Sequence, residues 1–180
     1  MRRVVSELFI SLDGDPSAQR VAVDNFDEDM MAELNAHIAR EDAVLLGRVR
    51  YQEWACYWPT STDEPYASHI NNTPKYVVST TLKKVDWQNS RLIRGDLGQE
   101  IAKMKKQPGK NIGVAGSRTL VESLLQNDLL DELVLMMHPM VVGHGKRLFK
   151  DGRALKGPKL VDSRTARTRV AILVYQSRSR

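Results

Sequence analysis

The residues best placed to do chemistry form a turn of small and hydroxyl side chains in the second half of the chain. A strand pattern that starts at Asn111 ends at Ala115 and Gly116, and leucines at helical spacing follow Ser117. A strand, a tight turn and a helix in this order present unpaired N–H groups and the positive end of a helix dipole, which together bind phosphate. The turn is therefore either a phosphate or cofactor cradle, where small residues including Gly113 let a ligand approach the backbone, or an ordinary turn capped by Ser117.

A second turn of the same kind ends the apolar run from Ala43 to Gly47. Arg48 and Arg50 follow directly, and their guanidinium groups would add charge-assisted hydrogen bonds to the N–H groups at the start of a helix. Two such turns in one small domain favour a dinucleotide or a pair of phosphorylated ligands. The alternative is that both arginines are solvated surface groups.

Other candidate side chains would serve the substrate rather than a phosphate. Asp13 follows the apolar run from Val4 to Leu12, so it should stand at the carboxyl end of a strand, where its alternative role is a structural Asx turn. Tyr51, Trp54 and Trp58 supply aromatic rings, some for the core and some for a cleft that takes a flat heterocycle. We take Asp13 and Tyr51 as candidate catalytic groups, and Asp13, Trp54 and Trp58 as candidate substrate contacts.

Length, charge and cysteine content limit the class of protein. The chain has 180 residues, which suit a single domain over residues 1–180, and its single cysteine excludes an internal disulfide. The net charge of +5 is spread along the chain, with no recognised binding motif, which disfavours nucleic acid as a partner. No secretory signal or membrane-spanning apolar run is visible, which predicts a cytoplasmic protein. His37 is expected at the surface or facing the helix dipole and, without a second ligand candidate, gives no reason to expect a metal.

Apolar periodicity alternates between strands and helices along the chain. A helix is expected to begin at a cap formed by Asp24 or Asn25, with an acidic first turn and an apolar stripe that runs to Ile38. The expected strands are residues 4–12, 43–47, 75–81, 91–94, 111–115, 131–138, 159–161 and 168–175, and further helices follow 47 and 117 and cover about 66–70 and 96–106. The last two strands should pair antiparallel across an arginine-rich link at 163–167, and the tail from 176 should fray.

The order and spacing of these motifs resemble the dihydrofolate-reductase-like fold. More closely, the chain is similar to stand-alone proteins related to the C-terminal reductase half of the bacterial riboflavin-biosynthesis deaminase-reductase. The resemblance covers nearly the whole chain, without the zinc-binding deaminase half, and its motifs are Val44 to Tyr51, Tyr76 to Thr80, Ile112 to Ser117, Asp131 to His138 and Gly143 to Phe149. It implies an α/β, three-layer fold with a central mixed, mostly parallel sheet flanked by helices and a C-terminal antiparallel edge.

The resemblance also implies an NADPH-dependent reductase and assigns its cofactor contacts. The first turn and the end of the next strand would surround the adenosine phosphates, and the second turn would lie against the pyrophosphate. The residues at the matching positions are Gly47, Arg48, Arg50, Ser79, Thr80, Ala115, Gly116, Ser117, Arg118 and Thr119. Arg50 departs from the family pattern by replacing a hydroxyl residue, although a guanidinium suits a 2′-phosphate, and Ala115 adds a methyl group where the family has a glycine.

The substrate is less closely defined by the resemblance. Dihydrofolate reductases place a carboxylate on the helix before the Gly-Arg turn, and the same spacing here reaches Met31, which disfavours folate. The expected substrate is a small heterocyclic or carbonyl compound, most specifically 5-amino-6-(5-phosphoribosylamino)uracil, reduced by a homodimer. The alternatives are a non-catalytic NADP(H)-binding protein on the same fold and, less favoured, a dihydrofolate reductase or a nucleic-acid binder.

Overall fold

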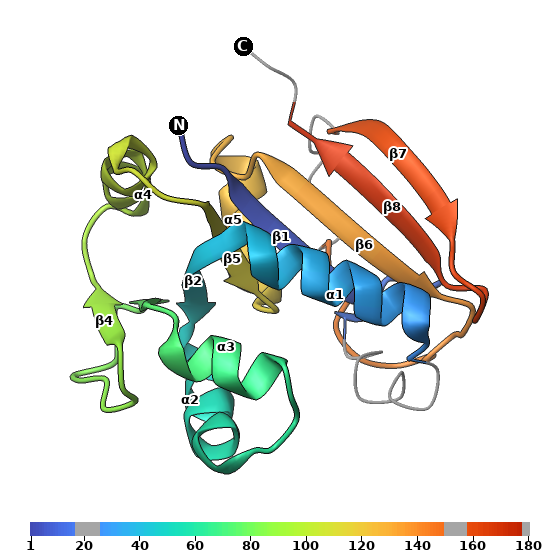
Figure 1. Ribbon diagram of the computed structural model, residues 1–180. Helices are drawn as coiled ribbons and strands as arrows, with labels where there is room; N and C mark the ends of the chain where they lie inside the picture. The colour runs from blue at the N-terminus through green and yellow to red at the C-terminus, as the bar shows by residue number, and fades with distance from the viewer. Residues whose placement is uncertain (17–25, 150–157, 178–180) are drawn as a thin grey trace.

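The computed structural model describes residues 1–16, 26–149 and 158–177. Its strands form one eight-stranded sheet in the order β4-β3-β2-β5-β1-β6-β8-β7 (Figure 1). The strands are β1 (Val4–Ser11), β2 (Glu41–Gly47), β3 (Lys75–Val78), β4 (Ser90–Ile93), β5 (Asn111–Ala115), β6 (Glu132–His138), β7 (Lys159–Thr165) and β8 (Ala171–Gln176). The helices are α1 (Glu28–Arg40), α2 (Arg48–Tyr57), α3 (Tyr66–Asn72), α4 (Leu97–Lys106) and α5 (Arg118–Gln126), with a short 3₁₀ turn η3 (Trp58–Thr60).

The sheet is mixed but mostly parallel. In the order of the sheet, the neighbouring strands β4, β3, β2, β5, β1 and β6 all pair in parallel. Strand β8 runs antiparallel to both of its neighbours, β6 and β7. The register places Glu7 beside Ala115 and Leu45 beside Val114. Because parallel strands end at the same edge, the carboxyl ends of β2, β5 and β1 lie together. This arrangement confirms the fold class expected from the sequence.

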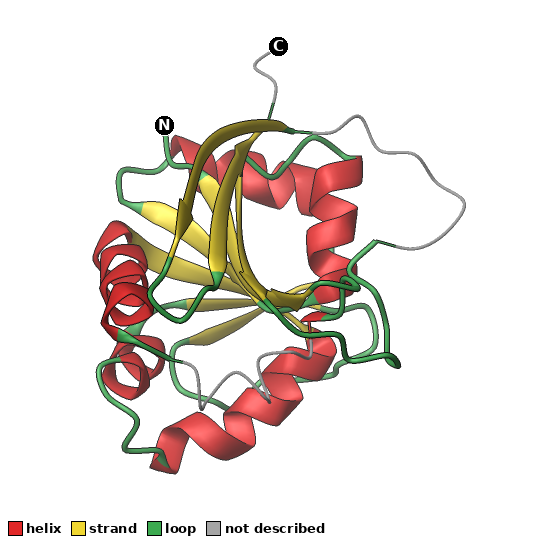
Figure 2. Ribbon diagram, turned by 90° about the vertical axis from the view of Figure 1, so that its right-hand side faces the viewer, coloured by secondary structure: helices red, strands yellow, loops and turns green. Residues whose placement is uncertain are grey.

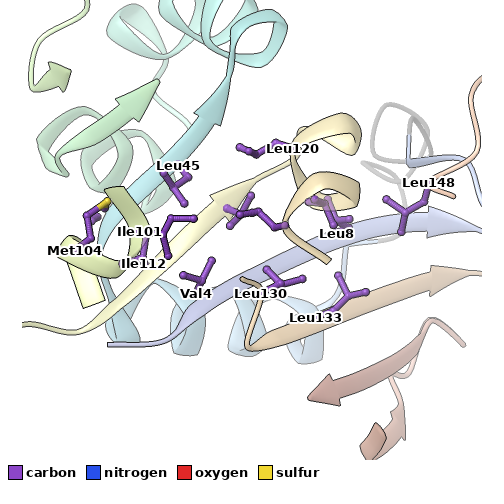
Figure 3. Packing of buried hydrophobic residues seen from close by; sticks show 14 of the residues in the cluster. Val4, Leu8, Leu45, Ile101, Met104, Ile112, Leu120, Leu130, Leu133 and Leu148 are labelled. Carbon is purple, nitrogen blue, oxygen red and sulfur yellow. The ribbon is translucent and has the colours of Figure 1, made fainter. Parts of the chain in front are cut away.

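Alternate residues of the strands face two separate layers of helices. Leu45 and Leu133 belong to a buried cluster with residues of α4 and α5 (Figure 3). Val44 packs instead in a cluster with Tyr51 of α2 and Ile70 of α3, and Val134 packs with Met30 of α1. The helices therefore cover both faces of the sheet and complete three layers (Figure 2).

Two sequence-based boundaries were wrong. Helix α1 has Asp27 as its N-cap, whose carboxylate accepts the Met30 N–H at 2.9 Å, whereas the predicted caps Asp24 and Asn25 lie outside the described residues. Strand β7 continues through residues 163–165, which had been expected in a link, because Ser163 and the residues after it pair with β8. The sequence predicted a frayed tail from residue 176. Residue 176 instead ends β8, and residues 178–180 lie outside the described part of the chain.

No helix within residues 1–16, 26–149 and 158–177 has both the length and the apolar character needed to cross a bilayer.

Candidate functional site

The two predicted phosphate-binding turns pack directly against each other. A Cβ atom built on Gly47 would overlap Oγ of Ser117 and lie 2.9 Å from its Cβ, although the two residues are far apart in sequence. Arg50 joins the same turns, because its Nη2 donates a hydrogen bond of 3.0 Å to the carbonyl oxygen of Gly116. The absence of a side chain at Gly47 therefore allows the ends of β2 and β5 to meet.

A cavity of about 900 Å³, the first cavity, opens between these turns. Seven of the predicted cofactor residues line it, namely Gly47, Arg48, Arg50, Gly116, Ser117, Arg118 and Thr119. Lys146 adds a fourth basic side chain from the loop after β6, while Asp15 and Glu53 contribute carboxylates. The excess of cationic groups favours an anionic ligand in this cavity.

Two helices begin at the wall of the first cavity. Among the described residues, neither N-cap residue, Gly47 for α2 nor Ser117 for α5, makes a side-chain capping hydrogen bond. The capping role considered for the Ser117 side chain is therefore not observed. The first N–H groups of a helix have no acceptor within the helix, and with the helix dipole they attract anions. The two N-termini thus add to the charge of the neighbouring arginines.

Ser79 and Thr80 are not among the described residues that line the first cavity. Ser79 is buried at the end of β3, where its Oγ accepts the N–H groups of Thr81 at 3.2 Å and Leu82 at 3.0 Å. Thr80 is exposed. These hydrogen bonds give Ser79 a role in shaping the turn after β3, and its predicted cofactor contact stays a prediction.

Asp13 and Tyr51 line neither of the two cavities described here, and their polar atoms are engaged by the backbone. The carboxylate of Asp13 accepts the Ser11 hydroxyl at 2.5 Å and the N–H groups of Val142 at 3.1 Å and Gly143 at 2.9 Å. These hydrogen bonds lower the pKa of Asp13 to about 2. The buried Tyr51 hydroxyl accepts the N–H of Trp87 at 3.1 Å. Both residues therefore hold loops in place, which favours a structural role for Asp13.

A second cavity, of about 480 Å³, meets the first at Arg50 and Gly116. It lies on the face of the sheet covered by α1, α2 and α3, and Ala115, Trp54 and Trp58 are among its lining residues. The two indole rings are 5.7 Å apart and nearly perpendicular. The predicted substrate contacts Trp54 and Trp58 thus come together in a largely apolar space next to the phosphate-binding turns.

Three lining residues of the second cavity, Glu7, His37 and Glu41, belong to a cluster of carboxylates and histidines that was not predicted from the sequence, and His69 joins it from behind Glu41. His37 Nδ1 lies 3.4 Å from a carboxylate oxygen of Glu7, and His37 Nε2 lies 3.0 Å from Glu41. The other oxygen of Glu41 is 2.5 Å from His69 Nε2. We refer to these four residues, Glu7, His37, Glu41 and His69, as the acid–histidine cluster. Of the two positions predicted for His37, the surface one is wrong, because only 15% of its side chain is exposed, whereas its place in the last turn of α1, toward the negative end of the helix dipole, is confirmed.

Burial and mutual attraction set the charges of this cluster. Burial raises the pKa of Glu7 to about 7. Burial alone would lower the pKa of His37, but the carboxylates of Glu41 and Glu7 outweigh it and raise this pKa to about 9. Burial would raise the pKa of Glu41, but its two histidine partners lower it below the usual value. No three His, Cys, Asp or Glu side chains in the described chain are placed to hold a metal ion.

Two sequence features could have indicated the cluster. Glu7 interrupts the apolar strand β1, and a charged residue in such a position requires a partner or a function. Gly113 lies within β5, where an added Cβ would overlap the Glu41 Oε2 atom and lie 2.8 Å from its Cδ. The prediction that Gly113 gives a ligand access to the backbone is therefore wrong, because the Glu41 carboxylate fills that space.

Comparisons with known proteins identify relatives over nearly the whole chain. A family model described as RibD C-terminal domain matches residues 2–173. The uncharacterized protein YyaP of Bacillus subtilis (strain 168) is 31% identical over 178 residues, which cover 97% of this chain and 94% of YyaP.

Solved structures share the fold at lower sequence identity. A Shewanella sp. PV-4 protein, provisionally named a riboflavin biosynthesis protein, has a TM-score of 0.76 at 20% identity. The superposition covers 98% of this chain and 99% of the Shewanella chain. The Thermotoga maritima diaminohydroxyphosphoribosylaminopyrimidine deaminase/5-amino-6-(5-phosphoribosylamino)uracil reductase has a TM-score of 0.69 at 12% identity, over 98% of this chain and 56% of that chain. At these identities the likeness shows a common fold.

Proposed function

The chain belongs to the RibD C-terminal domain family, and on that basis we propose that it is an NADPH-dependent reductase of a small heterocyclic or carbonyl substrate. The observation that carries the proposal is the junction of the two cavities at Arg50 and Gly116. The first cavity has the size and the cationic lining that a dinucleotide requires, and the second is largely apolar and aromatic. A dinucleotide in the first cavity would have room for its reactive ring next to a substrate in the second.

The turn at Gly116 supports a phosphate-bearing cofactor. Its φ of 52° lies in the left-handed region, and a Cβ there would approach Arg50 Nη2 to 2.8 Å. Glycine at this position leaves the turn open between the N-terminus of α5 and the guanidinium groups of Arg48 and Arg118. The residues present therefore fit a diphosphate group.

When bound, the reduced nicotinamide would supply the hydride, and the remaining work falls to the chain itself. The helix N-termini and basic side chains would hold the phosphates. Trp54, Trp58 and Tyr66, whose rings are in contact with one another, would orient a flat substrate and exclude water. Arg50, whose Cζ is 5.4 Å from the centre of the Trp54 ring, lies between the two groups of residues.

The most specific form of the proposal is reduction of 5-amino-6-(5-phosphoribosylamino)uracil. The name of the Thermotoga maritima protein includes this reaction, and the aromatic second cavity suits an aminouracil ring. Its phosphate group would need a cation, and Arg50 places a guanidinium group in the lining of the second cavity at its junction with the first. The family membership supports this substrate over folate, for which Met31 offers no carboxylate.

One observation favours a non-catalytic NADP(H)-binding protein as a second candidate. The Arg50 guanidinium already donates to the Gly116 carbonyl and lies 3.4 Å from the Glu53 carboxylate. These contacts cross the turn against which a pyrophosphate would lie. A protein with this turn could bind the cofactor without completing hydride transfer.

Titration with NADPH tests both candidates. We expect saturable binding that changes the fluorescence of Trp54 and Trp58, followed by oxidation of NADPH when 5-amino-6-(5-phosphoribosylamino)uracil or a simple carbonyl compound is added. The absence of saturable binding at micromolar NADPH would exclude both candidates. Binding without oxidation across aminopyrimidine, pterin and carbonyl substrates would favour the non-catalytic protein.

The substitution Arg48→Ala locates the phosphate site. If a charged hydrogen bond to phosphate is lost, NADPH binding should weaken by about 1.5–3 kcal/mol, which is roughly tenfold or more. Within the described part of the chain, Arg48 Nη1 donates a hydrogen bond only to Gln52 Oε1, at 3.0 Å on an exposed surface, so the fold should not depend on it. Arg91→Ala, at an exposed position of β4, is the matched control. Equal affinity of both variants and the wild type would place the phosphate elsewhere.

We also propose that the protein acts in the cytoplasm as a homodimer. All seven residues of the edge strand β7 are exposed, including Leu160 and Val161, and a second copy could cover this edge. Sedimentation analysis should give twice the chain mass of 20.4 kDa. A monomer at micromolar concentration would contradict this part of the proposal.

A further inference from the structure

Glu7 has an unusual position for an acidic side chain. It lies in the middle of β1, lines the second cavity, and keeps only 8% of its side chain exposed. Its Oε2 atom has no hydrogen-bond partner among the described residues, although His37 Nδ1 is 3.4 Å away. A buried carboxyl oxygen without a hydrogen bond is costly, so the site is better satisfied when a ligand supplies the missing partner.

The same cavity contains a second buried polar atom without a partner. Trp58 Nε1 is buried and makes no hydrogen bond within the described chain. A ligand that fills the cavity could therefore accept a hydrogen bond from Trp58 and exchange a proton or hydrogen bond with Glu7. This combination points to a planar ligand with polar atoms on its edge rather than to a hydrocarbon.

The sheet register places Glu7 next to the junction of the two cavities. Glu7 is the neighbour of Ala115 across the parallel pair β1 and β5, and adjacent strands are about 4.8 Å apart. Ala115 and Gly116 form the turn that separates the first cavity from the second. Glu7 thus lies beside the point where a substrate in the second cavity would meet a cofactor in the first.

The acid–histidine cluster supports Glu7 from behind. His37 stands between Glu7 and Glu41, and Glu41 is fixed by His69 and by the space that Gly113 leaves free. His69 Nδ1 lies 3.5 Å from Thr73 Oγ1, which extends the cluster into α3 and its C-cap. An imidazolium at His37 would stabilise the Glu7 carboxylate after a proton has left it.

Charged groups on α1 and β2 act on the Glu7 carboxyl group. Glu33, His37 and Arg40 act from α1, and Glu41 acts from the start of β2. Other titratable groups line the same cavity, namely Arg50 of α2, Tyr66 of α3, and Asp63 and Glu64 of the segment before α3. Burial has the largest effect and holds the pKa of Glu7 at about 7, with Glu33 and Glu41 raising it and His37 and Arg40 lowering it. A general acid works best when its pKa lies near the working pH.

We propose that Glu7 is the catalytic acid that protonates the substrate during its reduction. This inference rests on the proposed reductase function and defines its substrate class as compounds with a polar double bond, C=N or C=O. Glu7 would give its proton to the nitrogen or oxygen of that bond, and a bound reduced nicotinamide would supply the hydride to its carbon. The O–H bond of Glu7 breaks and an N–H or O–H bond forms, which leaves the reduced substrate, the oxidised nicotinamide and a Glu7 carboxylate that solvent reprotonates.

The substitution Glu7→Gln removes the proton and keeps the size of the side chain. The control is Glu28→Gln on α1, whose side chain is 84% exposed and lies outside both cavities. NADPH affinity should remain within about twofold of wild type in both variants, which also shows that they are folded. The single-turnover rate of hydride transfer to 5-amino-6-(5-phosphoribosylamino)uracil should fall about 10²- to 10⁴-fold in Glu7→Gln alone.

Two pH measurements separate a catalytic acid from a structural carboxylate. The wild-type rate should decline as pH rises through about 7, and this break should be absent from the residual rate of Glu7→Gln. Infrared difference spectra of the protein without substrate should show a protonated carboxyl group that titrates near pH 7 and is missing in Glu7→Gln.

Several results would overturn the inference. One is a Glu7→Gln variant whose rate and pH profile match those of the wild type. Another is a Glu7 carboxyl group that titrates near its ordinary value of 4.5. Failure of the proposed function looks different, because NADPH would then not bind, or would bind without being oxidised, in the wild type itself. In that case the infrared titration still decides whether Glu7 holds a proton at neutral pH.

Discussion

Replacing Gly47 with alanine should force apart the two turns that form the first cavity. The added Cβ would overlap Oγ of Ser117 and lie 2.9 Å from its Cβ. The backbone of Gly47 has φ −78° and ψ 159°, which alanine adopts freely, so backbone strain contributes nothing. The effect of Gly47→Ala should therefore come mainly from the contact between the turns, with a smaller part from placing alanine at the N-cap of α2.

The expected size of this effect follows from the packing. Adding a methyl group to a well-packed interior costs about 1–3 kcal/mol, so the free energy of unfolding should fall by about that amount. Ser117 cannot simply rotate away, because its Cβ as well as its Oγ is too close. NADPH affinity should fall by about tenfold or more, since the N-termini of α2 and α5 would no longer converge on one cavity.

Urea unfolding and NADPH titration measure the two effects. Gly95→Ala is the control, because a Cβ at that position meets no atom within 4 Å. Ser117→Gly removes both clashing atoms, so the double variant should recover most of the loss, with a coupling free energy of at least about 0.5 kcal/mol. The idea that the turns act together would be refuted if the stability changes of the two single variants added up to that of the double variant. It would also be refuted if Gly47→Ala bound NADPH with wild-type affinity.

Two further outcomes concern the acid–histidine cluster. Gly113→Ala should lower the free energy of unfolding by about 1–3 kcal/mol, because its Cβ would overlap a Glu41 carboxylate that two histidines hold; an unchanged urea midpoint would contradict this. The wild type should also lose stability relative to Glu7→Gln as pH rises from about 4.5 to about 7. Burial raises the pKa of Glu7 from 4.5 to about 7, so the folded state binds the Glu7 proton more tightly than the unfolded state does. This tighter binding stabilises the folded protein by on the order of 3 kcal/mol below pH 4.5. The stabilisation is lost as the pH rises from about 4.5 through about 7. Urea unfolding of both proteins across this range checks the sign, and parallel curves would show that Glu7 has an ordinary pKa in the folded protein.

The sequence alone indicated most main-chain features of the fold, apart from the N-cap of α1 and the extent of β7. Apolar runs of period two and 3.6 indicated the strands and helices, and the small residues at Gly47 and Gly116 marked the two turns. Because parallel strands end at one edge, the order of the elements also implied that the turns could meet. These features depend on residues close in sequence, or on a topology that few folds satisfy.

Only the tertiary structure decided which polar side chains gather in and behind the lining of the second cavity. Glu7, His37, Glu41 and His69 come from four different elements, and their proximity depends on sheet register and on the packing of α1 and α3 against one face. Conversely, Asp13 has the position of a catalytic residue in the sequence, but the N–H groups of a distant loop occupy its carboxylate. Local pattern determines where the backbone turns, whereas the partner, and thus the charge, of a buried side chain is set by residues that only folding brings near it.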